Sequence, residues 1–226
     1  RRDLAACLRT GRALRVPCAR AQQRGRHFLT PEVMISQRPA EVADRAVPGH
    51  WEGDIILGLN SSAIGTLVER TTRFTILLHL PAMAGHGLEV RTKHGPALAG
   101  HGAEAVRNAI ASKIGSLPTH LRKSLTWDQG AEMAQHAELK LATDMEIYFC
   151  DPSSPWQRGT NENTNGLLRQ YFPKGTDIGR YRKHELDAVA ATLNSRPRKT
   201  LEWKTPAEAF NALLSSEQAI HVATTA

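Results

Sequence analysis

The chain has 226 residues, of which 41% are hydrophobic and 23% are charged, and its formal net charge is +7. This length allows one sizeable core with an appendage, but it is short for two full catalytic domains. No run of about 18 apolar residues occurs, so we expect no membrane-spanning helix. The basic start has no apolar stretch followed by a cleavage site, so we do not expect a secretory signal there.

The three cysteines, Cys7, Cys18 and Cys150, are an odd number at wide spacing. This pattern is typical neither of a disulfide framework nor of a paired zinc site. We therefore predict reduced thiols in a cytoplasmic protein. The chain also lacks an initiator Met, and we interpret it as a fragment, a processed product or a truncated reading frame.

Much of the positive charge lies near the start of the chain. Guanidinium groups match phosphate oxygens through paired donors, so an arginine-rich arm predicts contact with nucleic acid, although charge does not say which kind. A merely solvated basic tail is the alternative. We assign residues 1–45 to a basic arm or linker, the remnant of a missing DNA-binding region. Within residues 1–29, where Asp3 is the one acid, the arginines are Arg1, Arg2, Arg9, Arg12, Arg15, Arg20, Arg24 and Arg26.

Three strands are predicted in close succession after Gly49. Apolar and β-branched residues fill 51–57, 63–69 and 74–80, with turn-forming residues between them. Such closely spaced strands predict an antiparallel meander. A stretch rich in Gly and His over 81–102 then predicts a long loop.

Helices and short strands alternate in the rest of the chain. Helical spacing begins near Glu104, and short strands are predicted at 124–127 and 146–150. This order predicts an α/β fold with a mixed sheet flanked by helices, in a domain over 46–215 that is followed by a C-terminal tail at 216–226. Further helices are predicted at 132–143, from Thr160 or Asn161 to Tyr171, and at roughly 184–194 and 206–215.

Three carboxylates are candidates for chemistry. Asp54 lies in the first predicted strand, where apolar residues follow it, and a carboxylate there is unfavourable unless something binds it. Glu52, two residues earlier, points to the same face of the strand. Asp128 ends another predicted strand before a sharp turn, and Glu162 lies 33 intervening residues later at a helix start.

Each of these acids alone is equally typical of a turn or of a helix start. Together, three converging carboxylates would suit Mg²⁺ or Mn²⁺, which prefer oxygen ligands. On the predicted helix, Glu162, Asn165 and Arg169 fall on one face, which places donors beside a carboxylate as a phosphate-backbone contact needs. An exposed, Asn-rich helix start is the alternative interpretation.

The strings HWEGD (50–54), TWDQG (126–130) and PWQRGTNEN (155–163) resemble the three acidic motifs of transposases of the insertion-sequence-thirty type. Further matches lie at 167–175, 193–199 and 204–206, and the resemblance covers roughly residues 36 to 212.

The resemblance implies a ribonuclease-H-like, retroviral-integrase-like core. It places the first Asp on the first strand, the second Asp after the fourth strand and the Glu on a later helix. It implies that Asp54, Asp128 and Glu162 are the catalytic acids of an enzyme that cuts element ends and joins them to target DNA. As a mechanism we expect two Mg²⁺ or Mn²⁺ ions, with Asp54 bridging them and Asp128 and Glu162 each holding one.

Several expectations about partners follow from the same resemblance. The partners would be double-stranded DNA and further copies of the chain, in the bacterial cytoplasm and at the nucleoid when bound to DNA, with no membrane. The family also carries an N-terminal helix-turn-helix region that recognises the element ends, and here only the basic arm precedes the core. The candidates for DNA contact are Gln129, Arg158, Asn161, Asn165, Arg169, Lys174, Arg196, Arg198 and Lys199.

Two other functions remain open on the sequence. One is a ribonuclease-H-like nuclease that hydrolyses without joining. The other is a truncated, catalytically inactive remnant that still binds DNA.

Overall fold

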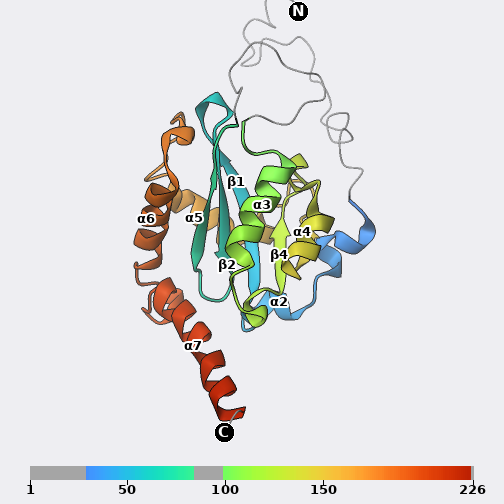
Figure 1. Cartoon of the computed structure of the whole chain (residues 1–226), viewed down its shortest axis with the longest axis vertical. Helices are drawn as coiled ribbons and strands as arrows, with labels where there is room; N and C mark the ends of the chain where they lie inside the picture. Colours follow the sequence, from blue (N-terminus) through green and yellow to red (C-terminus); the bar gives the residue numbers. More distant parts are fainter. Residues whose placement is uncertain (1–28, 84–98, 225–226) are drawn as a thin grey trace, which may run out of the picture.

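A computed structural model of the chain describes residues 29–83 and 99–224 (Figure 1). The arginines of the predicted basic arm, Cys7 and Cys18 lie outside the described residues, as does most of the predicted Gly- and His-rich loop. None of the described helices is long and apolar enough to cross a membrane.

One five-stranded mixed sheet forms the centre of the fold, in the order β3-β2-β1-β4-β5. The pairs β1–β2 and β2–β3 are antiparallel, whereas β1–β4 and β4–β5 are parallel. This arrangement confirms the expected antiparallel meander joined to parallel strands in a mixed sheet. The strands are β1 (His50–Leu57), β2 (Ala63–Glu69), β3 (Thr75–Leu80), β4 (Ser124–Trp127) and β5 (Glu146–Phe149).

Helices cover both faces of this sheet (Figure 1). Helices α3 and α4 pack together over one face, α5 packs against β1 and β2 on the other face, and α6 lies along β3. Helix α7 continues away from the sheet toward the C-terminus. The helices are α2 (Glu41–Asp44), α3 (Ala103–Ile114), α4 (His136–Thr143), α5 (Gly159–Leu168), α6 (Lys183–Asn194) and α7 (Pro206–Thr224).

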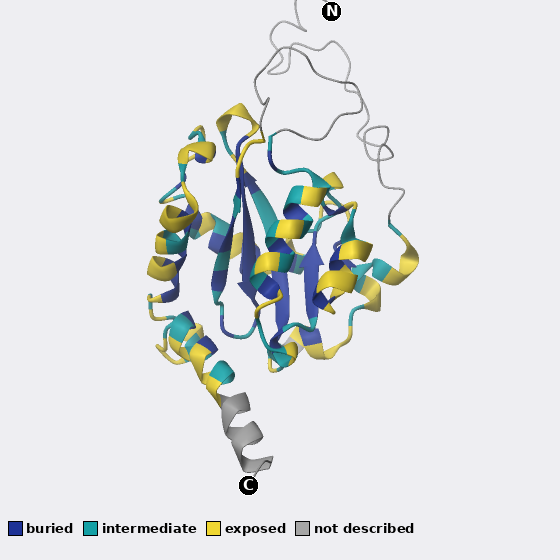
Figure 2. Ribbon diagram, viewed as in Figure 1, coloured by how far each residue is buried: buried dark blue, intermediate teal, exposed yellow. Residues whose placement is uncertain are grey.

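Strand alternation separates the core into two clusters, one on each side of the sheet. The strands are mostly buried, and the exposed residues lie mainly on the outer sides of the helices and in the turns (Figure 2). In β1, Trp51 faces the cluster under α3, whereas Ile56 faces the cluster under α5 and α6. Since side chains two residues apart share a face, Glu52 and Asp54 lie on the side of Ile56, toward α5. The strand therefore presents its two acids to one helix.

Short 3-10 helices account for several differences from the predicted boundaries. The helix predicted over 132–143 is split, because Gln135 has a non-helical backbone between a 3-10 turn and α4. The helix predicted to reach Tyr171 ends at Leu168. The 3-10 helices are Pro31–Val33, Ile35–Gln37, Leu59–Ser61, Thr119–Leu121, Ala131–Met133, Pro155–Arg158, Ile178–Arg180 and Lys199–Leu201.

Both ends of the described chain differ from a simple arm and tail. Leu29, Val33 and Met34 pack on the core, and Met34 forms a bridge to Phe149 of β5. At the other end, α7 continues to Thr224 through a stretch that contains no Gly or Pro to end it. The boundaries of the proposed domain over 46–215 remain predictions.

Candidate active site

The two aspartates are brought together by the contact between β1 and β4. A Cβ on Gly53 would overlap Cζ3 and Cε3 of Trp127, so the indole ring lies directly on the backbone of β1. Trp127 is fully buried, and its Nε1 donates to Oε1 of Glu132 at 3.0 Å. Because Gly53 precedes Asp54 and Trp127 precedes Asp128, this contact places both carboxylates at the same edge of the sheet.

The guanidinium of Arg158 lies among the three predicted catalytic acids. Nη1 is 3.3 Å from Oδ1 of Asp54, and Nη2 is 3.9 Å from Oδ2 of Asp128 and 3.8 Å from Oε1 of Glu162. Nη1 also donates to the carbonyl oxygen of Gly53 at 2.6 Å. The carboxylates on β1, after β4 and on α5 therefore converge on one point, which a buried cation occupies.

The electrostatics agree with this convergence. Burial raises the pKa of Asp54 above its usual value, and the charge of Asp128 adds to that rise, although Arg158 opposes it. Burial also raises the pKa of Glu162, with further increases from Asp54 and Asp128. The three carboxylates therefore lie near enough to repel one another, and a cation between them relieves that repulsion.

Arg158 itself is only 6% exposed. Burial alone would lower the pKa of its guanidinium, but the carboxylates of Asp54 and Asp128 outweigh that effect and raise it. Arg158 is therefore a fixed positive charge that balances the acids. We predicted that Arg158 contacts DNA; the structure places its guanidinium among the three acids, and contact with DNA stays a prediction.

A second buried ion pair fixes the start of α5 on the sheet. Glu52 is fully buried, and its Oε1 accepts from Nη1 of Arg70 at 2.5 Å. Its other oxygen accepts from the backbone N–H of Asn161 at 2.9 Å. Asn161 in turn accepts from the hydroxyl of Thr66 on β2 at 2.9 Å. These bonds hold Glu162, the next residue, at a set position beside β1.

Oxygen donors of this kind fit a hard divalent cation. Asp54 is one-fifth exposed, and the side chains of Asp128 and Glu162 are 46% and 42% exposed, so solvent reaches the acids. Among the described residues, no three His, Cys, Asp or Glu side chains are already arranged to enclose a metal ion. The guanidinium of Arg158 accounts for this, because it spaces the three acids around itself.

A fourth carboxylate, Glu132, was missed by the sequence analysis. It accepts the hydrogen bond from Nε1 of Trp127, and burial raises its pKa, with the charge of Asp128 adding to the rise. Asp128 also accepts from the backbone N–H of Gly130 at 3.2 Å. The spacing Asp-x-Gly-x-Glu over 128–132 could have indicated it, because the tight turn brings the fifth residue back toward the first.

Three of the predicted DNA-contact residues bind the protein itself. The amide of Gln129 donates to the carbonyl oxygen of Cys150 at 2.9 Å. Asn161 is fully buried. Asn165 donates to Oδ2 of Asp54 at 2.9 Å. Gln129 and Asn165 thus orient the loop of Asp128 and the carboxylate of Asp54, and the predicted contacts with DNA stay predictions.

The other predicted DNA-contact residues lie nearer to solvent. Lys174 and Lys199 are exposed, whereas Arg169 is half-buried and its Nη1 donates to the carbonyl oxygen of Phe172 at 3.4 Å. Arg196 donates to the hydroxyl of Tyr171. These cations follow α5 and α6 away from the acids, and contact with DNA remains a prediction for each.

Cys150 is free, buried and close to the acids. Burial raises the pKa of its thiol to about 11, so the thiol stays protonated at neutral pH. A protonated thiol is a poor nucleophile, so the structure gives no reason to assign covalent catalysis to Cys150.

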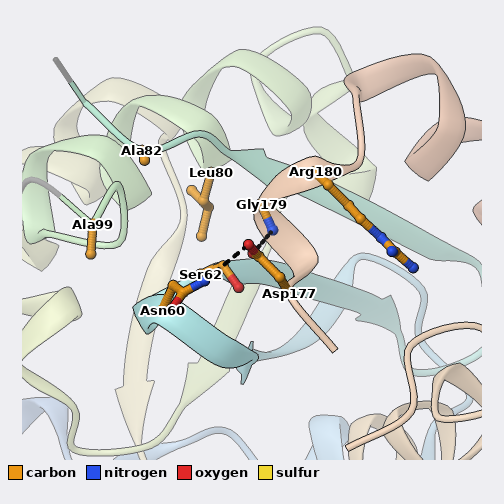
Figure 3. Close-up of a pocket in the computed structure, with 8 residues that line it drawn as sticks. All are labelled: Asn60, Ser62, Leu80, Ala82, Ala99, Asp177, Gly179 and Arg180. Carbon is orange, nitrogen blue, oxygen red and sulfur yellow. Dashed lines mark hydrogen bonds between the residues drawn. The ribbon is translucent and has the colours of Figure 1, made fainter. Parts of the chain in front are cut away.

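A separate hollow of about 290 Å³ lies where β2 begins and β3 ends (Figure 3). Its main polar group, Asp177, accepts from Asn60 at 3.2 Å and from the backbone N–H of Gly179 at 3.0 Å. Both carboxylate oxygens therefore have partners within the protein. Of the described residues that line this hollow, Arg180 is exposed and Asp177 is half-buried, so the hollow has one charge of each sign.

No family model matches the chain. Curated proteins do match the chain, and several of these relatives are named as transposases. The chain is 50% identical to the transposase for insertion sequence element IS1086 of Cupriavidus metallidurans, over 96% of this chain and 58% of that protein. It is 49% identical to the InsI transposase for element IS30C of Escherichia coli, over 84% of this chain and 45% of that protein.

A more distant relative is the transposase for element IS4351 of Bacteroides fragilis, which is 32% identical over 84% of this chain and 53% of that protein. The chain thus spans about half the length of the curated relatives it matches. Among solved structures, it is similar to a simian T-cell lymphotropic virus intasome in complex with the PP2A regulatory subunit B56 gamma. The identity is 18% and the TM-score is 0.48, over 71% of this chain and 53% of that chain.

Proposed function

Because the chain belongs, across most of its length, with the insertion-sequence transposases of the IS30 type, we propose that it is the catalytic part of such an enzyme. It would cut DNA at the ends of a mobile element and join those ends to a second DNA site. One observation carries this proposal: Asp54, Asp128 and Glu162, which are far apart in the sequence, surround a single point at the end of β4, beside β1 and α5.

The proposed chemistry depends on two divalent ions, Mg²⁺ or Mn²⁺, held by these three acids. Asp54, Asp128 and Glu162 would supply the carboxylate ligands that hold them. When bound, the ions would supply charge neutralisation at the phosphate and activation of the attacking oxygen. The chain's own groups set the geometry, since Asn165 orients Asp54 and Glu132 braces the loop of Asp128.

The remaining parts of the proposal concern partners. Double-stranded DNA, as element ends and as target, would be the substrate, and further copies of the chain would assemble on it. The net charge of +7 supports association with a polyanion. We place the protein in the bacterial cytoplasm, at the nucleoid when it is bound to DNA.

Two rival functions predict different products. A nuclease of the ribonuclease H kind would release cut strands but no joined product. A DNA-binding remnant would do neither. The second rival, the DNA-binding remnant, is less well supported. All three carboxylates lie close together, and DNA binding alone does not require that arrangement.

Strand transfer with labelled, pre-nicked element ends and Mn²⁺ tests the proposal. The full chain is compared with Asp128→Ala and with Glu138→Ala, a matched loss of an exposed carboxylate on α4. Joined product from the chain and from Glu138→Ala, but none from Asp128→Ala, is the expected result. Cut strands without joined product would favour a nuclease, and DNA binding without metal-dependent reaction would favour the remnant.

Asp54→Asn provides the second arm of the test. The amide keeps the size of the side chain and can still accept from Asn165, but it is a weaker ligand for a cation. Cutting should disappear while most of the DNA affinity remains. Unchanged cleavage by this variant would remove Asp54 from the proposed site.

A further inference from the structure

A second cavity, of about 360 Å³, lies beside the first turn of α5. We call it the arginine pocket, because three arginines from distant parts of the chain line it: Arg45 after α2, Arg73 in the turn before β3, and Arg198 after α6. The lining residues include no acid. The other lining groups are mostly hydroxyls and an amide, including those of Thr160, Asn163 and Thr200.

The carboxylates of Glu52 and Glu69 raise the pKa of Arg73, but neither forms an ion pair with a guanidinium of the pocket. Among the side chains that the structure describes, which do not include that of Asp44, no carboxylate forms an ion pair with Arg45, Arg73 or Arg198. The nearby acids are already engaged, since Glu52 pairs with Arg70 and Glu69 accepts from the backbone and hydroxyl of Thr72.

The arginine pocket also contains a hydrogen-bond donor that has no partner. Nη1 of Arg73 donates to the hydroxyl of Thr160 at 3.1 Å, which anchors that guanidinium at the start of α5. Nε of Arg198 is buried and has no hydrogen-bond partner, and its Nη2 makes a single long contact with the carbonyl oxygen of Leu193 at 3.5 Å. Burial lowers the pKa of Arg73, and repulsion from Arg45 and Arg198 lowers it further. An anion in the pocket would relieve that repulsion.

The chemistry of the pocket fits a phosphate better than a carboxylate or a neutral ligand. Guanidinium groups present paired donors that match phosphate oxygens, and hydroxyl and amide side chains are common additional donors to a DNA backbone. Asn163 and Thr200 are exposed, so the pocket is open to a polymer and not only to a small ion.

The pocket is separate from the three catalytic acids. Thr160, Asn163 and Thr164 lie on one face of α5, three and four residues apart, whereas Glu162 and Asn165 lie on the opposite face. A helix with its side chains is about 10 Å across. A DNA strand rises about 3.4 Å per nucleotide. A phosphate in the pocket would therefore lie roughly three nucleotides from the bond at which the acids act.

We propose that the arginine pocket binds one backbone phosphate of DNA, about three nucleotides from the cleaved bond, and so sets the register of the strand on α5. This inference rests on the proposed function for the identity of the polymer. It adds Arg45 and Arg73, which the sequence did not single out, to the residues that contact DNA, and it gives Arg198 a specific partner.

Binding of a labelled nicked duplex, measured by fluorescence anisotropy in EDTA over a series of salt concentrations, tests the pocket without catalysis. The variants are Arg45→Gln, Arg198→Gln and the double variant, with Lys140→Gln on α4 as the charge-matched control. Because each phosphate contact contributes about 0.9 to the slope of log affinity against log salt, the double variant should lose about one such unit. Both arginines contact the same phosphate, so the two single losses should add to more than the loss in the double variant.

A scan of single methylphosphonate substitutions along the strand identifies the phosphate. One position, about three nucleotides from the cleaved bond, should weaken binding by the unaltered chain and by Lys140→Gln, but have no further effect on the double variant. Unfolding curves for each variant show that the fold is intact.

Three outcomes would overturn the proposal. In the first, the chain binds and joins DNA but no methylphosphonate position is coupled to Arg45 and Arg198, which removes the pocket and leaves the proposed function. In the second, inorganic phosphate binds the pocket as tightly as DNA does, and no methylphosphonate position is coupled to Arg45 and Arg198. That result would indicate a site for small anions. In the third, the unaltered chain does not bind DNA, and the pocket and the proposed function fail together.

Discussion

The indole ring of Trp127 lies on the backbone of Gly53, where a Cβ would overlap Cζ3 and Cε3 of the ring. The ring is fully buried and tied to Glu132, so it cannot move aside easily. The absence of a side chain at one position of β1 therefore sets the distance between β1 and the end of β4. Because Asp54 and Asp128 follow these two residues, the same contact sets the spacing of the two aspartates.

Gly53→Ala should lower the free energy of unfolding by about 2 kcal/mol, since overpacking a rigid core contact costs about 1–3 kcal/mol. It should also reduce strand transfer, because Asp54 is displaced from Asp128. Gly166→Ala is the control: nothing lies within 4 Å of a Cβ there. It replaces a helical Gly and should stabilise the chain by about 1 kcal/mol. Chemical denaturation measures both, and equal effects of the two variants would refute the role of the Trp127 contact.

The pH dependence of stability should carry a contribution from His50. Burial, with the positive charge of Lys123, lowers the pKa of His50 from 6.5 to about 4 in the fold. Its Nδ1 lies 2.8 Å from Oγ of Ser124. Between about pH 6.5 and 4 the unfolded chain binds a proton that the folded chain does not, so stability falls as the pH falls through this window. The loss is on the order of 3 kcal/mol at most, because one pKa unit corresponds to about 1.4 kcal/mol.

His50→Asn isolates this contribution. Asn keeps a hydrogen-bonding group toward Ser124 but does not titrate, so the fall in stability between about pH 6.5 and 4.5 should be shallower than in the unaltered chain. His184→Asn, an exposed position on α6, should leave the slope unchanged. Urea denaturation at several pH values gives both slopes. Parallel slopes for the chain and His50→Asn would show that His50 protonates equally in both states.

The edge of the sheet at β3 should depend on Asn194. Its Oδ1 accepts from the backbone N–H of Thr75 and its Nδ2 donates to the carbonyl oxygen of Thr75, both at 2.8 Å. Asn194 is 5% exposed, so Asn194→Ala leaves both backbone groups without partners in a buried place. The free energy of unfolding should fall by about 2 kcal/mol or more.

Thr192→Ala on the exposed side of α6 is the matched control for Asn194→Ala. It should change stability by less than about 0.5 kcal/mol. Hydrogen exchange at the Thr75 amide provides a local measurement, since loss of its acceptor should speed exchange there. Unchanged exchange at Thr75 in Asn194→Ala would mean that water or a neighbouring group replaces the side chain.

Local patterns predicted most of the elements well. The strands at 63–69 and 124–127 have the predicted bounds, because their apolar runs end at turn-forming residues on both sides. The break at Gln135 was not predicted, since Glu132 to Thr143 has helical composition throughout. Its cause is tertiary: Glu132 and Met133 are held by Trp127 and the core, which bends the chain before α4 begins.

The site was less predictable than the fold. Asp54 was predicted as a carboxylate within an apolar strand, and Asp128 and Glu162 were predicted from a strand end and a helix start; their catalytic role stays a prediction. Burial of Arg158 could not be read from its polar neighbours, because it depends on the packing of α5 against β1. The arginine pocket could not be predicted from the sequence either. Its three cations come from segments that are about 30 and 125 residues apart along the chain, and they meet only in the fold.

Arg158 and divalent ions should compete for the same carboxylates. Without metal, Arg158→Gln leaves Asp54, Asp128 and Glu162 facing one another with no balancing charge, and removing one partner of a buried ion pair costs roughly 3–5 kcal/mol. Because Asp128 and Glu162 are nearly half exposed, we expect a smaller loss, about 2 kcal/mol, in EDTA. Mn²⁺ should then stabilise Arg158→Gln more than it stabilises the unaltered chain, since a ligand that binds only the folded state stabilises it.

Unfolding curves in EDTA and in a titration of Mn²⁺ measure this coupling directly, and Asp54→Asn with Arg158→Gln completes a double-mutant cycle. The double variant should regain part of the stability lost by Arg158→Gln, because one of the repelling charges is gone. The same Mn²⁺ increment in the unaltered chain and in Arg158→Gln would show that the guanidinium does not occupy the place of the ions. In that case Arg158 would serve only to hold α5 to the carbonyl group of Gly53.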